Sequence, residues 1–224
     1  MASPLDLQEQ EQLDQLKAFW AKHGNLITWL LTLVLMAYAA HNGWNWYQRE
    51  QSAKAAVLFA ELERATAAQD TARVQSAWAD MKERYARTAY GPQSALLVGQ
   101  VWANQGRWTE SAEALQWASE NGSDDALRVV ARLRWSALLI QMEKAQEALA
   151  VLDKATGQGF DPLVDDRRAD AHLALGQTDQ AKTALQRAYS GMGPEVEYRR
   201  VVQAKMMSLG MAVDSPEAKA KVGS

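Results

Sequence analysis

Few residues of this sequence have types and spacings suited to acid–base or metal chemistry. His172 is the only one of the three histidines beyond residue 41, and Asp170 precedes it by two positions. On a helix, two positions correspond to about 200°, so these side chains point to nearly opposite faces. They cannot share a proton or a metal ion without another element. We therefore expect His172 to pack in the core.

Asp165 and Asp166 form a second candidate, because adjacent carboxylates can divide the roles of acid and base. Near the start of a helix, however, acids are ordinarily favourable partners of the helix dipole. The chain has no Cys, which excludes thiol catalysis, zinc sites built from thiolates and disulfides. It also has no Gly-rich phosphate loop, nucleophile elbow or metal-ligand spacing. We expect no catalytic residue, cofactor or metal, and hence no enzyme and no small-molecule substrate.

The composition narrows the fold and the partners. The 224 residues carry a net charge of -3, with 23% charged residues, so there is no basic footprint for nucleic acid. The five prolines, the abundance of Ala and Leu and the lack of strand-type alternation predict an all-α chain. This length accommodates one membrane anchor and one globular unit.

Residues 24–47 contain no Asp, Glu, Lys or Arg. As a helix they would extend about 36 Å, enough to cross a hydrocarbon core of about 30 Å. Trp44, Trp46 and Tyr47 close the segment, as aromatic residues do at a membrane boundary. The sequence therefore predicts a transmembrane anchor at 24–47, preceded by an amphipathic segment at 1–23 that would lie on the bilayer or on a partner.

Two other interpretations of the apolar segment are a buried core helix and a cleaved signal peptide. Ala37 and Ala39 form the small-residue pattern that precedes a cleavage site. The preceding segment is long and acidic, whereas a signal peptide has a short basic start. An uncleaved anchor fits better. Lys17 and Lys22 on one side balance Arg49 and Lys54 on the other, so charge does not determine the orientation.

The polar part of the chain repeats with a period of about 34 residues. Small residues recur where two helices would cross, at Ala77, Ser111, Ala148 and Ala181. Large apolar residues follow them by four positions, at Met81, Leu115, Leu152 and Leu185. Small residues also precede them by twelve positions, at Ala65, Gly99, Ser136 and Ala169. This pattern predicts stacked antiparallel helical hairpins, because small side chains let helix axes approach and large ones fill the gap between hairpins.

We expect hairpins at about 49–86, 92–121, 124–157 and 161–190. A terminal helix at about 194–209 would complete a repeat domain at 48–210, and 211–224 would form a flexible tail. Gly106 and Gly176 can take the left-handed conformation that ends a helix, with Thr109 and Thr178 capping the next one. Pro162 suits a first helical turn. The first hairpin follows the anchor without Gly or Pro after Gly43, so its first helix is expected to continue from the anchor.

The segment ADAHLALGQTDQAKTALQRA resembles the tetratricopeptide repeat, whereas the first repeat, with Arg84 where Ala is usual, resembles it less. An acidic start containing EQEQLDQLKAFWAKHG, an anchor ending in WNWYQ and the following repeats are together similar to the bacterial YfgM family. This resemblance implies a single-pass inner-membrane protein with a cytoplasmic N-terminus and a periplasmic repeat domain. It also implies an ancillary subunit of the SecYEG translocon that connects it to periplasmic chaperones. An alternative is a regulatory adaptor in envelope-stress signalling that acts through residues 1–23.

In tetratricopeptide domains the first helix of each hairpin lines a concave groove. The resemblance places nine residues in such a partner-binding groove: Gln93, Leu96, Gln100, Asn104, Val130, Arg134, Gln141, Asp166 and Asp170. The Lys and Asn residues with which chaperone-binding members clamp a terminal carboxylate are missing at the matching positions. Capture of a peptide C-terminus is therefore disfavoured.

Overall fold

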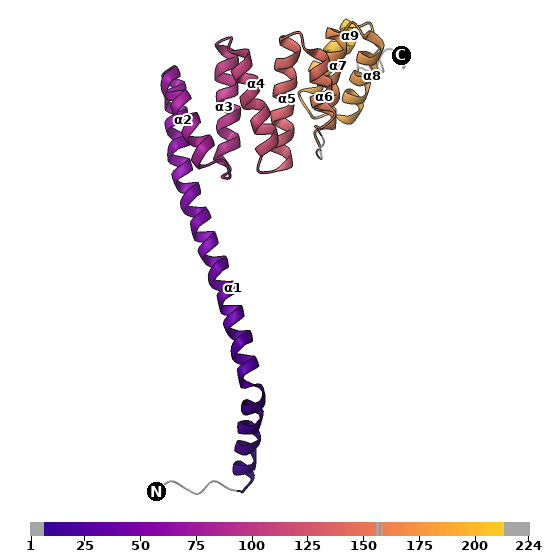
Figure 1. The fold of residues 1–224 in the computed structure, drawn as a ribbon. Coiled ribbons are helices and arrows are strands. Elements are labelled where there is room, and N and C mark those ends of the chain that lie inside the picture. The colour runs from indigo at the N-terminus through magenta and orange to yellow at the C-terminus, as the bar shows by residue number, and fades with distance from the viewer. Residues whose placement is uncertain (1–6, 156, 158, 213–224) are drawn as a thin grey trace. The chain divides into compact units, whose positions relative to one another are not determined.

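The computed structural model describes residues 7–155, 157 and 159–212, and every regular element among them is an α-helix (Figure 1). The chain divides into two compact units, Met1–Gln51 and Ser52–Ser224. Helix α1 (Leu7–Ala67) runs through the first unit and supplies the first helix of the second. Within the described residues, helical hairpins and one further helix make up the rest of the second unit. The expectation of an all-α chain is confirmed.

In the first unit, α1 holds the apolar stretch of the sequence. It is the one helix among the described residues long and apolar enough to cross a membrane. Only 6% of its most apolar window is buried, unlike the core helix of a soluble protein. The helix already begins at Leu7, so the described part of the expected amphipathic segment at 1–23 is continuous with the apolar stretch. Its side chains include Leu16, Phe19 and Trp20, which are 62%, 52% and 57% exposed.

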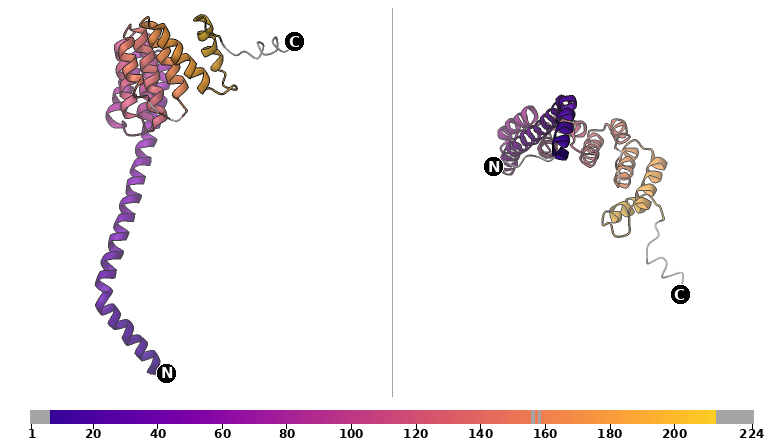
Figure 2. Two further views of the ribbon diagram at one scale, coloured as in Figure 1. Left: turned by 90° about the vertical axis from the view of Figure 1, so that its right-hand side faces the viewer. Right: turned by 90° about the horizontal axis from the view of Figure 1, so that it is seen from below.

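The second unit stacks hairpins in chain order, and the stack curves (Figure 2). Its first hairpin joins the end of α1 to α2 (Thr71–Arg84), and the expected continuation from the apolar stretch into this hairpin is confirmed. The next are α3 (Tyr90–Asn104) with α4 (Trp108–Asn121), α5 (Asp125–Gln141) with α6 (Ala145–Leu152), and α7 (Asp161–Ala174) with α8 (Thr178–Gly191). Helix α9 (Arg199–Ser208) packs on α8 through Val202 and Met206.

Two helix boundaries differ from expectation. Helix α6 ends at Leu152 rather than near 157, because the chain tightens into short turns there and then follows a loop in which Gly159 has φ +84°. Helix α9 begins at Arg199 rather than near 194. The segment after Gly193 instead forms a turn closed by a hydrogen bond from the Val196 N–H to the Gly193 carbonyl, 3.1 Å.

The core confirms the repeat pattern. At the crossings, Ala77, Ser111, Ala148 and Ala181 are at most 5% exposed. Ser111 shows how close the helices come, since its hydroxyl donates to the Gly99 carbonyl of the facing helix at 2.6 Å. A Cβ atom on Gly99 would lie 2.9 Å from Leu115 Cγ, so this crossing accepts only glycine without rearrangement. Small residues therefore set the spacing between helices.

The predictions for the turns within the hairpins are confirmed in part. Gly106 and Gly176 have φ values of +73° and +72°, as expected for left-handed helix ends. The expectation that Thr109 and Thr178 cap the following helices is wrong, because the capping positions are Arg107 and Gln177. In both turns the capping residue follows the glycine directly, and its backbone N–H donates to a carbonyl of the preceding helix at 2.8 Å. Neither capping residue makes a side-chain capping hydrogen bond. Pro162 lies in the first turn of α7, as expected.

Candidate functional site

A pocket of about 360 Å³ lies between α3 and α5, the helices on which most of the expected groove residues lie. Three residues named for the groove line it: Gln100 from α3 and Arg134 and Gln141 from α5. Apolar walls come from Ala103, Ala137 and Leu138, and α4 contributes Ser111 and Leu115. The first helices of two successive hairpins thus bring together residues that are 41 positions apart in sequence (Gln100 to Gln141). This pocket can accommodate a chain segment with both apolar and polar contacts.

Arg134 is the one charged residue that lines this pocket. It is exposed, and within the described ranges it makes no hydrogen bond or ion pair. Neighbouring arginines on the same helix are engaged: Arg128 donates to the Gly122 carbonyl at 2.7 Å, and Arg132 donates to the Lys154 carbonyl at 2.7 Å. Arg134 therefore offers the groove a free guanidinium group.

The other predicted groove residues of α3 and α5 do not line this pocket. Gln93 and Asn104 lie near opposite ends of α3 and are exposed. Leu96 and Val130 are half-buried. Leu96 packs against the core cluster to which α1, α2, α3, α4 and α5 contribute, so it contributes to the fold.

Asp166 departs from the groove expectation, since it is only 1% exposed. Its carboxylate accepts hydrogen bonds from the Tyr198 hydroxyl at 2.8 Å and from Lys205 Nζ at 2.9 and 3.0 Å. Lys205 Nζ also donates to Asp170 at 2.7 Å, and Arg167 donates to Asp170 at 3.0 Å. Helix α9 therefore occupies both acids, and a partner cannot reach Asp166 without displacing Lys205.

This network shifts the protonation equilibria of its members. Burial alone would lower the pKa of Lys205, but its hydrogen bonds to Asp170 and Asp166 and their charges outweigh burial and raise that pKa above its ordinary value. Burial, together with the hydrogen bond to Asp166, raises the pKa of Tyr198. Both shifts favour the protonated side chain in the folded state.

Asp165 and His172 also have structural roles. Asp165 accepts from Arg168 at 3.3 Å and from Arg187 of α8 at 3.1 Å. His172 Nδ1 lies 2.7 Å from Gln177 Oε1, which joins the two ends of the α7–α8 turn. Asp165 and Asp166 lie at the fifth and sixth residues of α7, so they act as ion-pair partners between helices rather than at its first turn. Asp165 and His172 are therefore both engaged in contacts within the α7–α8 hairpin.

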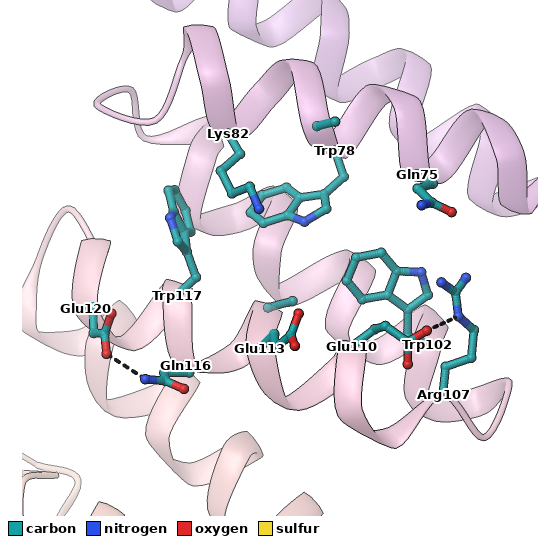
Figure 3. Close-up of a pocket in the computed structure, with 12 residues that line it drawn as sticks. Gln75, Trp78, Lys82, Trp102, Arg107, Glu110, Glu113, Gln116, Trp117 and Glu120 are labelled. Carbon is teal, nitrogen blue, oxygen red and sulfur yellow. Dashed lines mark hydrogen bonds and ion pairs between the residues drawn. The ribbon is translucent and has the colours of Figure 1, made fainter.

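A second pocket, of about 470 Å³, is lined by α2, α4 and Trp102 of α3, and no sequence pattern predicted it (Figure 3). The rings of Trp78 and Trp117 meet edge to face at 5.2 Å. Lys82 Nζ lies 5.7 Å from the centre of the Trp78 ring, and Arg107 lies 5.3 Å from that of Trp102. The tryptophans come from different repeat positions, so their convergence follows from the stacking of hairpins and leaves no signal in the repeat pattern.

The charges of this second pocket are largely engaged within the protein. Arg107 Nε donates to Glu110 at 3.0 Å, and Gln116 donates to Glu120 at 3.0 Å. The backbone hydrogen bond of Glu110 and its bond to Arg107 lower the pKa of that carboxyl. By contrast, the pocket between α3 and α5 contains Arg134, which has no partner among the described residues. We therefore take the pocket between α3 and α5 as the candidate site.

A stack of helical hairpins with small residues at the crossings and a groove lined by first helices defines a tetratricopeptide-type repeat protein, here joined to an apolar N-terminal helix. The chain belongs to the family described as "Tetratricopeptide repeat-like domain", whose family model matches residues 17–211.

Curated relatives extend this result. The chain is 26% identical over 207 residues to the "Ancillary SecYEG translocon subunit" of Neisseria gonorrhoeae, covering 91% of this chain and 98% of the relative. Proteins of the same name from Escherichia coli and Haemophilus influenzae are each 25% identical, over 79% and 91% of this chain and 84% and 98% of their own lengths. No solved structure matches the chain. The similarity to the YfgM family is confirmed.

Proposed function

We propose that this protein is a membrane-anchored adaptor of protein translocation, ancillary to the Sec translocon and linking it to periplasmic chaperones. The observation that carries the proposal is the alignment with relatives named as SecYEG translocon subunits over 91% of the chain. The family match begins at residue 17, so it includes the apolar segment at 24–47 as well as the repeats. In this proposal the anchor associates with the translocon and the groove binds a protein partner.

The proposed location is the bacterial inner membrane, crossed once at 24–47. Residues 1–23 then lie in the cytoplasm and the repeat domain at 48–210 lies in the periplasm. The single candidate membrane helix of the described residues supports a single crossing. Most of the proposed tail at 211–224 lies outside the described residues.

Affinity purification of the full chain in mild detergent tests this proposal. Translocon subunits and periplasmic chaperones should be enriched over a mock purification from cells without the tagged protein. If neither group is enriched, the export role loses its support.

A regulatory adaptor in envelope-stress signalling is the second candidate, favoured by the exposed apolar side chains of Leu16, Phe19 and Trp20 before the apolar segment. Such side chains suit contact with a signalling protein. Deleting residues 2–16 separates the candidates. An altered stress response with intact translocon association would favour signalling through this segment, and an unaltered response would remove that role.

A further inference from the structure

We propose that the pocket between α3 and α5 binds an extended segment of a partner protein through an acidic side chain, with Arg134 as its counter-ion. The inference rests on the proposed function, since it specifies what the groove of the adaptor recognises. Arg134 supplies the charge, Gln100 and Gln141 add uncharged polar groups to the lining, and apolar residues form the walls.

The charge of the pocket determines the kind of side chain that it accepts. The guanidinium group of Arg134 can donate two parallel hydrogen bonds to a carboxylate, a geometry that an amide or hydroxyl group does not match. No acid lines the pocket, so nothing within it competes for this cation. A partner carrying Lys or Arg at this point would instead be repelled.

The polar groups beside Arg134 suit the backbone of an extended segment. The side-chain amides of Gln100 and Gln141 each present both donor and acceptor groups, as a peptide backbone does. Ser111 offers a partner no free donor, because its hydroxyl donates to the Gly99 carbonyl at 2.6 Å and the residue is fully buried. Ala103, Ala137 and Leu138 then provide apolar contact for small side chains.

The acids of the neighbouring hairpin do not reverse this preference. Asp166 and Asp170 are both bonded to Lys205, so they present no free negative charge to a basic segment. Recognition of a side-chain carboxylate by one arginine also differs from the clamp for a terminal carboxylate, whose residues are absent.

Three fluorescent peptides of equal length, identical except for a central Glu, Gln or Lys among alanines, test the inference. Binding to the full chain in mild detergent is measured by fluorescence polarisation. The Glu peptide should bind about fivefold more tightly than the Gln peptide, as expected for a partly exposed ion pair, and the Lys peptide most weakly. Arg134→Glu should reverse the order of the Glu and Lys peptides, whereas Arg134→Lys should preserve it.

Arg87→Glu is the matched control, because Arg87 is exposed in the loop between α2 and α3 and lies outside the pocket. It makes the same change in net charge and should leave the order unchanged. Equal binding of the three peptides, or an equal effect of Arg87→Glu and Arg134→Glu, would overturn the inference. Circular dichroism of each variant shows whether it is folded. If the three peptides do not show the expected order of affinities but the full chain still purifies with translocon subunits, this inference alone is refuted. If the chain does not purify with translocon subunits, the proposed function is refuted.

Discussion

Lys205 joins α9 to the stack through hydrogen bonds to two carboxylates, one of which, Asp166, is almost fully buried. Replacement of Lys205 by Ala would leave that buried carboxylate with Tyr198 as its one remaining partner among the described side chains. We expect a loss of about 3 kcal/mol in the free energy of unfolding, because a buried charge without its partner is strongly destabilising. Urea denaturation of the parent protein and the Lys205→Ala variant measures this difference in the free energy of unfolding.

Arg200→Ala is the control for Lys205→Ala, since Arg200 is an exposed cation on the same helix. It should change stability by less than about 0.5 kcal/mol. Equal stabilities of the Lys205→Ala and Arg200→Ala variants would show that the network does not hold α9.

The same network predicts a dependence on alkaline pH. The pKa values of Lys205 and Tyr198 are raised above their ordinary values of 10.5 and 10.0, so the folded state binds protons more tightly than the unfolded state. Their contribution to stability is fully present below the ordinary values and is lost as the pH rises through the raised ones. Melting temperatures measured from pH 8 to 11 should therefore fall more for the parent protein than for the double variant Lys205→Met, Tyr198→Phe. Parallel curves would contradict this assignment.

At the scale of the helix, the crossing residues determine whether two elements can pack. Ala181 is fully buried at the crossing of α7 and α8. Enlarging it to Leu should overpack the crossing and cost about 1 to 3 kcal/mol. Gln100→Ala, at an exposed position of the groove, should cost less than about 0.5 kcal/mol. Thermal unfolding followed by circular dichroism measures both. If Ala181→Leu melts no lower than the parent, or Gln100→Ala melts far lower, the assigned repeat pattern is wrong.

The sequence predicted the hairpins and the crossing residues because each repeat must bury the same small and large side chains. It also predicted that Gln100, Arg134 and Gln141 would share a surface. It placed Asp166 in the groove because repeat position alone does not reveal that a later helix brings Tyr198 and Lys205 against it. The pocket of Trp78, Trp102 and Trp117 was missed for a related reason, since it depends on side chains from three helices with no shared repeat position.

The N-terminal helix supports a prediction about processing. The segment before residue 24 contains Asp6, Glu9, Glu11 and Asp14, whereas signal-peptidase substrates have a short basic start. The mature protein should therefore keep its first 40 residues. Mass spectrometry of the protein purified from membranes measures this. An N-terminus at Ala40 would contradict an uncleaved anchor.

For the whole molecule, an adaptor requires two attachments that operate at the same time. In the proposed function the anchor would supply one attachment and the groove between α3 and α5 the other. A groove that bound a chaperone while the anchor stayed on the translocon would raise the local concentration of the chaperone without direct contact between the two partners. Loss of either attachment should abolish this effect even when the remaining one is intact.

Purification of a tagged translocon subunit from cells that contain this protein and from cells that lack it tests the bridging role most directly. Mild detergent preserves the membrane complex, and the bound periplasmic chaperones are quantified by mass spectrometry. The account predicts that chaperones elute with the translocon when this protein is present and fall to the level of a mock purification when it is absent. Equal amounts of chaperone from the two kinds of cell would contradict it.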